Sequence, residues 1–192
     1  MQKHIILASA SPRRKDLLNQ IGLKFDIKSS DIDESSISYK NPYDLVKKLS
    51  LLKAKFVAKS NKNSIIISAD TVVVFKNKII GKPKDKRDAK KILKTLSSKM
   101  HTVITGFIIL DTQTSEIVSD FEESKVWFRK ISEEEIDSYV NSGEPLDKAG
   151  GYGIQEKGGI FVKKIEGDYF NVVGLPLSKV ASGLKKLGIS VI

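Results

Sequence analysis

The sequence contains no cysteine and only two histidines, His4 and His101. The absence of cysteine excludes a disulfide framework, thiolate zinc sites, iron–sulfur clusters and a cysteine nucleophile. The small number of histidines argues against a histidine-rich metal centre. A metal bound by this chain is therefore expected to be a hard divalent cation, which is held by oxygen atoms of carboxylates and phosphates.

Long hydrophobic runs are also lacking. No apolar stretch approaches the roughly 20 residues that a membrane-spanning helix needs, and the strand-like residues 4–8 follow no signal-peptide pattern. We therefore expect a cytoplasmic protein. The chain has 192 residues, of which 40% are hydrophobic and 29% charged. This is enough to bury a core and predicts a single domain over residues 1–192, built as one body or as two closely packed lobes.

Acidic residues are fewer than basic ones, 23 against 33, which gives a formal net charge of +10. Such a charge favours an anionic partner: nucleic acid, an acidic membrane surface or a phosphorylated small molecule. The lysines are scattered through almost every segment, as on a solvated surface. Aromatic residues do not alternate with basic ones, which argues against nucleic acid. The arginines are more informative, because Arg13 and Arg14 are adjacent.

Strand-like and helix-like segments interleave along the chain and predict a mixed α/β fold. Strands are predicted at 4–8, 24–28, 65–75, 79–80, 101–110, 117–129 and 160–165, with another short strand after the turn at 166–168. Helices are predicted at 12–21, 42–59, 85–97, 132–143 and 176–187, with a glycine-rich loop at 144–159. Five residues at helical spacing in the second helix predict its buried face: Leu45, Val46, Leu49, Leu52 and Phe56.

The segment from Ser9 to Arg14 lies between a predicted strand and a predicted helix, with Ser11 as N-cap and Pro12 at the first helical position. Cations in the first turn of a helix are disfavoured by a few tenths of a kcal/mol, so two arginines there need a reason. A bound anion would supply one, since backbone N–H groups, serine hydroxyls and guanidinium groups can all surround phosphate oxygens. The alternative is two surface arginines beside an ordinary Ser-Pro cap, and the pattern leaves both open.

Asp70 interrupts the apolar run 65–75. A buried carboxylate without partners costs several kcal/mol, so this side chain must be paired, hydrated in a cleft or bound to a metal. Asp70 could then activate a water molecule or bind a divalent ion; the alternative is an aspartate at a strand end or in a turn. Asp33 and Glu34 form a second acidic pair, which could hold a metal or be solvated.

Two further segments carry polar groups suited to a nucleotide. A short hairpin beginning beside Asp70 would return Lys82 towards that carboxylate, where the lysine could bind a phosphate. In the loop at 144–159, closely spaced glycines permit close approach of the backbone to a ligand. Gln155 in that loop offers both a donor and an acceptor, as reading a base edge requires. A flexible surface loop is the alternative for this segment.

Six segments in order resemble the Maf family of nucleoside triphosphate pyrophosphatases, also called septum formation inhibitors. They are residues 9–14, 68–73, 81–83, 105–106, 142–155 and 168–177, and the resemblance extends over nearly the whole chain. It implies a mixed α/β fold with a long twisted sheet flanked by helices and two lobes around a deep cleft, usually in a homodimer.

The resemblance also implies hydrolysis of a nucleoside triphosphate to the monophosphate and pyrophosphate with Mg²⁺ or Mn²⁺. Asp70 matches the general base that activates water, and Asp70 and Glu34 match the acids at the metal. The substrate-binding positions are Arg13, Thr71 and Gln155, which select the substrate, and Ser9, Arg14, Lys53 and Lys82, which form a polar cleft. Segment 144–155 resembles the branch acting on dTTP and UTP rather than the branch acting on 7-methyl-GTP.

The expected partners are therefore the nucleotide substrate and a second copy of the chain, with no membrane and no nucleic acid. The physiological substrate could be an ordinary pyrimidine nucleotide or a modified one removed as a housecleaning measure. A different class of function is a nucleotide-sensing binding partner of the septum-formation machinery, linked to cell-division arrest. The sequence shows no interaction motif that would support it.

Overall fold

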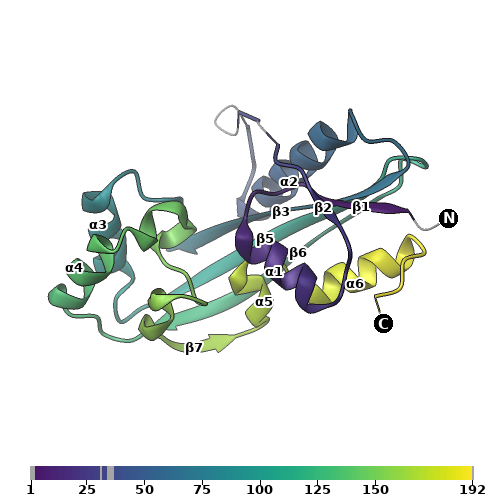
Figure 1. Cartoon of the computed structure of the whole chain (residues 1–192). Coiled ribbons are helices and arrows are strands. Elements are labelled where there is room, and N and C mark those ends of the chain that lie inside the picture. The colour runs from purple at the N-terminus through teal and green to yellow at the C-terminus, as the bar shows by residue number, and fades with distance from the viewer. Residues whose placement is uncertain (1–2, 31, 34–36, 192) are drawn as a thin grey trace. The chain divides into compact units, whose positions relative to one another are not determined.

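The structure is a computed structural model that describes residues 3–30, 32–33 and 37–191 (Figure 1). Within these residues seven strands form one mixed sheet in the order β2-β1-β3-β5-β6-β7, with β4 paired to β3. The predicted mixed α/β class is confirmed. The strands are β1 (His4–Leu7), β2 (Asp26–Ile27), β3 (Ser64–Phe75), β4 (Lys78–Ile80), β5 (Met100–Asp111), β6 (Ile117–Phe128) and β7 (Val162–Glu166).

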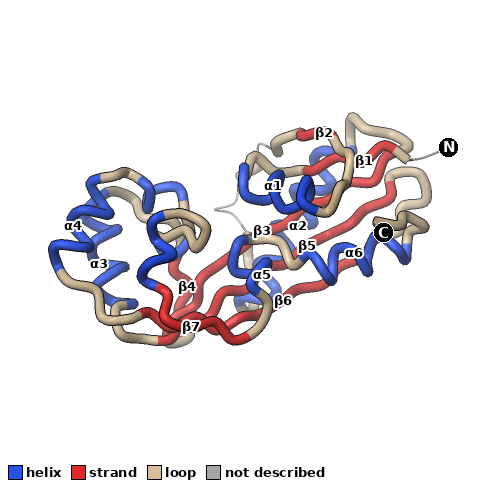
Figure 2. Tube along the Cα trace, turned by 60° about the horizontal axis from the view of Figure 1, so that its bottom comes forward, coloured by secondary structure: helices blue, strands red, loops and turns tan. Residues whose placement is uncertain are grey.

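Helices flank the sheet, as the tube in Figure 2 shows by colour. They are α1 (Pro12–Gln20), α2 (Pro42–Ala58), α3 (Lys86–Leu96), α4 (Glu133–Asn141), α5 (Tyr169–Val173) and α6 (Leu177–Lys186). Three 3₁₀ turns lie in the glycine-rich segment: η1 (Glu144–Asp147), η2 (Ala149–Gly151) and η3 (Lys157–Phe161). No helix in the described part of the chain is both long and apolar enough to cross a membrane.

The chain divides into two compact units. Unit 1 comprises residues 1–70, 105–122 and 174–192, and unit 2 comprises residues 71–104 and 123–173. The division falls within β3, between Asp70 and Thr71.

Unit 1 is built on parallel strands with helices on both faces. Residue Leu7 of β1 pairs with Ile27 of β2 and with Ile67 of β3. Strands β1 and β3 are largely apolar because parallel strands are covered on both sides, whereas both residues of the short strand β2 are exposed. On β5, Ile108 packs with the α2 residues Ala54 and Val57. Its neighbour in sequence, Ile109, faces α6. Since successive strand residues point to opposite faces, α2 and α6 cover opposite sides of the sheet.

Unit 2 surrounds one hydrophobic cluster that includes residues of α3, α4, β5 and β6. Figure 2 shows α3 and α4 side by side. Helix α4 begins with the capping box that the sequence predicts. The backbone N–H of Glu135 donates to Ser132 Oγ at 3.2 Å, and the N–H of Ser132 donates to the carboxylate of Glu135 at 2.9 Å. Arg129 binds both oxygens of this carboxylate and lowers the pKa of Glu135 to about 2.

Two sequence-based predictions about local structure are wrong. Leu52 and Phe56 are not in the buried face of α2, since they are 42% and 39% exposed. The buried face turns instead towards the small residues Ser50 and Ala54, which allow α2 to approach the sheet closely. The short strand expected after 166–168 is the helix α5. Its first turn forms because Asp168 accepts a hydrogen bond from the backbone N–H of Phe170 at 2.8 Å.

The close approach of α2 depends on Gly106 of β5. A Cβ at this position would lie 2.7 Å from Val46 Cγ2 and 2.8 Å from the backbone carbon of Val46. We expect Gly106→Ala to lower the free energy of unfolding by about 1–3 kcal/mol, as overpacking does in cores. Gly81→Ala is the matched control, because its Cβ would meet nothing within 4 Å. Urea denaturation measures both, and equal stability of the two variants would contradict the close contact.

Candidate active site

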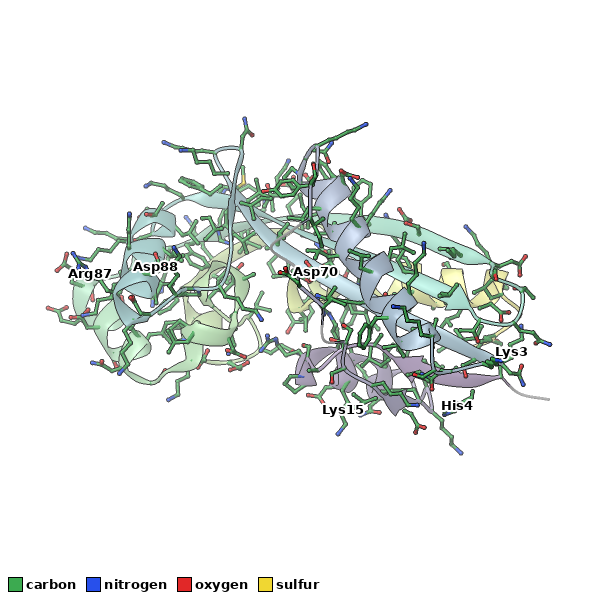
Figure 3. All side chains as sticks on the ribbon, turned by 90° about the horizontal axis from the view of Figure 1, so that it is seen from above. Lys3, His4, Lys15, Asp70, Arg87 and Asp88 are labelled. Carbon is green, nitrogen blue, oxygen red and sulfur yellow. The ribbon has the colours of Figure 1, made fainter. Side chains whose placement is uncertain are left out.

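Asp70 lies inside β3 and pairs with a lysine of α2. Lys53 Nζ donates to Asp70 Oδ1 at 2.5 Å, and the two side chains are only 14% and 13% exposed. Figure 3 marks Asp70 on β3, beside α2. Of the three states expected for this carboxylate, paired, hydrated in a cleft or bound to a metal, the structure shows the paired one. The alternative of an aspartate at a strand end or in a turn is wrong, because Asp70 lies within β3.

The register between α2 and β3 brings the two charges together. Ser68 and Asp70 are two residues apart on a strand and therefore point to the same face. Ser68 Oγ donates to the backbone carbonyl of Ser50 at 2.7 Å. Lys53 lies three residues after Ser50, on the same side of the helix. The buried serine contact thus fixes the height at which Lys53 meets Asp70.

Ser9 and Arg14 are joined at the turn between β1 and α1. Arg14 donates from Nη1 to Ser9 Oγ at 3.1 Å and from Nε to the backbone carbonyl of Gly174 at 2.8 Å. The chain itself thus supplies one reason for a cation in the first turn of α1. Ser11 occupies the N-cap position, but its side chain makes no capping hydrogen bond. Arg13 is half-buried on the same turn.

The Ser9–Arg14 pair follows β1, which is the neighbour of β3 in the sheet. Strands β1 and β3 are parallel with Leu7 opposite Ile67, and the N–H of Ala8 donates to the carbonyl of Ile67 at 2.7 Å. Continuing this register places Ser9 level with residue 69, one strand spacing of about 4.8 Å away. The chain that follows β1 therefore runs beside the part of β3 that leads to Asp70.

The remaining predicted substrate-binding residues belong to unit 2. The β3–β4 hairpin pairs Val73 with Ile80, and continuing this register places Lys82 level with Thr71. The turn that carries Lys82 contacts the glycine-rich segment, because the N–H of Gly150 donates to the carbonyl of Gly81 at 3.0 Å. Thr71 is half-buried, and Lys82 and Gln155 are exposed.

Comparison with known proteins shows which family the chain belongs to. Residues 4–187 match the family model described as Maf-like protein. The chain belongs to the Maf family. It is 50% identical over 193 residues to a protein of Dictyoglomus turgidum named dTTP/UTP pyrophosphatase, covering 100% of both chains. It is 51% identical over 185 residues to a protein of the same name from Alkaliphilus metalliredigens, covering 96% of each.

Among solved structures, the Maf chain is similar to a HAM1 protein from Coxiella burnetii. The alignment covers 96% of this chain and 100% of the other, with a TM-score of 0.48 and 15% identity.

Of the two acidic residues expected to bind a metal in this Maf chain, the structure describes one. Asp70 is in place, whereas Glu34 lies outside the described residues. Within residues 3–30, 32–33 and 37–191, no group of three or more histidine, cysteine or acidic residues could hold a metal ion. A single carboxylate still fits Mg²⁺ or Mn²⁺, because such cations are commonly bound through one or two carboxylates together with the phosphates of the substrate.

Sequence reasoning missed His101, which anchors the glycine-rich segment of the Maf chain. Its Nε2 lies 2.8 Å from the hydroxyl of Tyr152, and the two rings pack edge-on with Phe128. Burial lowers the pKa of His101 to about 4 and raises the pKa of Tyr152. The signal in the sequence is an isolated histidine at the start of an apolar strand, because a buried polar side chain needs a hydrogen-bonding partner.

The lowered pKa of His101 predicts a pH-dependent stability. The unfolded chain takes up this proton near pH 6.5 and the folded chain only near pH 4. The folded state is therefore fully stabilised above about pH 6.5 and loses up to about 3 kcal/mol as the pH falls towards 4. Urea denaturation at several pH values measures this slope. The double variant His101→Phe, Tyr152→Phe keeps both rings and should lose that part of the slope; an unchanged slope would contradict the assignment.

Proposed function

We propose that this Maf protein hydrolyses dTTP and UTP to the nucleoside monophosphate and pyrophosphate. The observation that carries the proposal is the buried Asp70–Lys53 pair, 2.5 Å apart, in a chain whose residues 4–187 match the Maf family. Relatives that are about half identical over the whole chain bear the name of this activity.

Asp70 is the residue suited to activate water. Its carboxylate can accept a proton from a water molecule as that water attacks the triphosphate, and the bond between the α- and β-phosphates breaks with pyrophosphate leaving. Lys53 holds one carboxylate oxygen and so orients the other. Little covalent chemistry is required of the protein beyond this, because phosphoryl transfer depends mainly on positioning and on neutralising charge.

The substrate carries about four negative charges, and the basic residues meet this need. We assign phosphate binding to Ser9, Lys53, Lys82 and Arg14; Arg14 is already fixed by its contacts to Ser9 and Gly174. We assign selection of the substrate to Arg13, Thr71 and Gln155. An amide side chain can both donate to and accept from a pyrimidine edge, which suits the exposed Gln155.

A divalent cation completes the proposed site. Asp70 and Glu34 are the residues that would hold Mg²⁺ or Mn²⁺, and the bound cation would neutralise charge on the phosphates. We further infer that the protein acts in the cytoplasm, where nucleoside triphosphates are made and used. We also infer a homodimer, which light scattering of the purified chain would test.

A panel of triphosphates with Mg²⁺ or Mn²⁺ tests the reaction, and Asp70→Asn tests its base. We expect pyrophosphate as product with dTTP and UTP, and a loss of turnover of about 10²-fold or more in Asp70→Asn. Nucleotide binding by that variant should partly survive, because the amide is the same size as the carboxylate. Asp137→Asn is the matched control: Asp137 lies on α4 in unit 2 and pairs with Lys90 of α3, so this variant should keep full activity. Orthophosphate as product, or undiminished turnover in Asp70→Asn, would refute the assignment.

Gln155→Ala tests base selection. The side chain is exposed, so the variant should keep the free energy of unfolding of the wild type to within about 0.5 kcal/mol. We expect the ratio of kcat/KM for dTTP and UTP to that for purine triphosphates to fall by about tenfold or more, since the site loses a hydrogen-bonding group. An unchanged ratio would remove Gln155 from substrate selection.

A further inference from the structure

Lys148 is a lysine with only 6% of its side chain exposed, in the segment between η1 and η2. Its ammonium donates to the backbone carbonyl of Glu144 at 2.8 Å and to Asp147 Oδ1 at 2.8 Å. It also pairs with Glu156 Oε2 at 3.1 Å. An ammonium has three donors, so all of its hydrogen-bonding capacity is used within this one segment.

Glu156 immediately follows Gln155, so the ion pair holds one end of the turn that carries Gln155. The other end is held by packing. A Cβ at Gly153 would lie 2.7 Å from Lys148 Cε, so the aliphatic stem of the lysine lies directly against the backbone of Gly153. The turn itself is closed by the N–H of Glu156, which donates to the carbonyl of Gly153 at 3.4 Å. One side chain therefore contacts both ends of the turn.

The two contacts restrict a turn whose tip is exposed. Gln155 has a flexible side chain, and a base contact is selective only where the donor and acceptor are held in place. A second set of contacts fixes the turn's surroundings: Glu144 Oε1 accepts from the hydroxyl of Tyr139 at 2.9 Å and from the N–H of Gly158 at 3.1 Å. The hydroxyl of Tyr139 also accepts from the N–H of Gly153 at 3.4 Å, whereas Lys148 reaches Glu156, the residue next to Gln155.

We propose that Lys148 is a positioning residue for base selection, which acts through Gln155 and does not touch the nucleotide. The inference rests on the proposed function, because it requires that Gln155 reads the base. Lys148 fixes where the amide of Gln155 stands, through the ion pair with Glu156 and the packing on Gly153. We call these two contacts of Lys148, the ion pair with Glu156 and the packing on Gly153, the clamp. Loss of the clamp would allow the turn to move and would weaken discrimination between bases, while the reacting groups of unit 1 stay as they are.

The test uses the full chain with Lys148→Met and Glu156→Ala, which break the clamp from its two ends. Lys157→Met is the matched control, because it removes the same charge from an exposed position in the same segment. For both clamp variants we expect KM for dTTP and UTP to rise about tenfold. Their kcat at saturation should stay within about threefold of the wild type, with a reduced preference over purine triphosphates. Lys157→Met should match the wild type.

A double-mutant cycle separates positioning from a merely structural role. If Lys148 acts through Gln155, the variant Glu156→Ala, Gln155→Ala should be no less selective than Gln155→Ala alone. Additive losses of selectivity would overturn the inference, as would clamp variants that are less stable to urea but keep the wild-type KM and base preference. Glu156→Ala alone decides the outcome if Lys148→Met does not fold, because the side chain of Glu156 is 38% exposed and that of Lys148 only 6%.

Failure of the proposed function gives a different result. A wild-type chain that shows no preference for pyrimidine triphosphates would overturn both the proposed function and this inference. A wild-type chain with the preference, together with clamp variants that retain it, would overturn the role of Lys148 alone.

Discussion

Asp70 carries a carboxylate in a strand whose other residues are mostly apolar. The ammonium of Lys53, with Nζ 2.5 Å from Asp70 Oδ1, stabilises the negative charge at this position. The pair is partly buried, so each charge is less well solvated than in water and is stabilised by the other. The position of α2 along β3 is therefore constrained by the pair. An ion pair of this kind is weak evidence for stability, because apolar residues of similar volume often serve a fold as well.

The pair forms where α2 lies directly against the sheet of unit 1. Gly106 leaves room for Val46, and the hydroxyl of Ser50 lies 2.6 Å from the carbonyl of Val46 and 2.9 Å from that of Gly106. A larger residue at Gly106 or Ser50 would push the helix outwards and lengthen the distance between Lys53 and Asp70. Packing between small residues thus sets the geometry of the charged groups, although none of the small residues carries chemistry itself.

The sequence predicts most elements of this fold because their signals are local. The apolar run around Asp70 does form one strand, and the capping box at Ser132 does begin a helix, since each needs only neighbouring residues. Leu52 and Phe56 were misassigned because helical spacing shows that a face is apolar but not how far the core extends around it. The helix at 169–173 was missed because five residues carry too little periodicity, and its cap at Asp168 was read as part of a turn.

The residues of the candidate site could also be predicted only in part from local sequence. An isolated ionisable residue in an apolar context predicts that a partner must exist, and this rule identifies Asp70 from the sequence alone. The rule does not identify the partner, since Lys53 is one of many lysines and only its resemblance to a family position singled it out. Applied evenly, the rule also points to His101, whose partner Tyr152 is far away in sequence. Tertiary packing determines which residues contact each other. The sequence can therefore predict that a buried ionisable group needs a partner, but only the fold shows which residue that partner is.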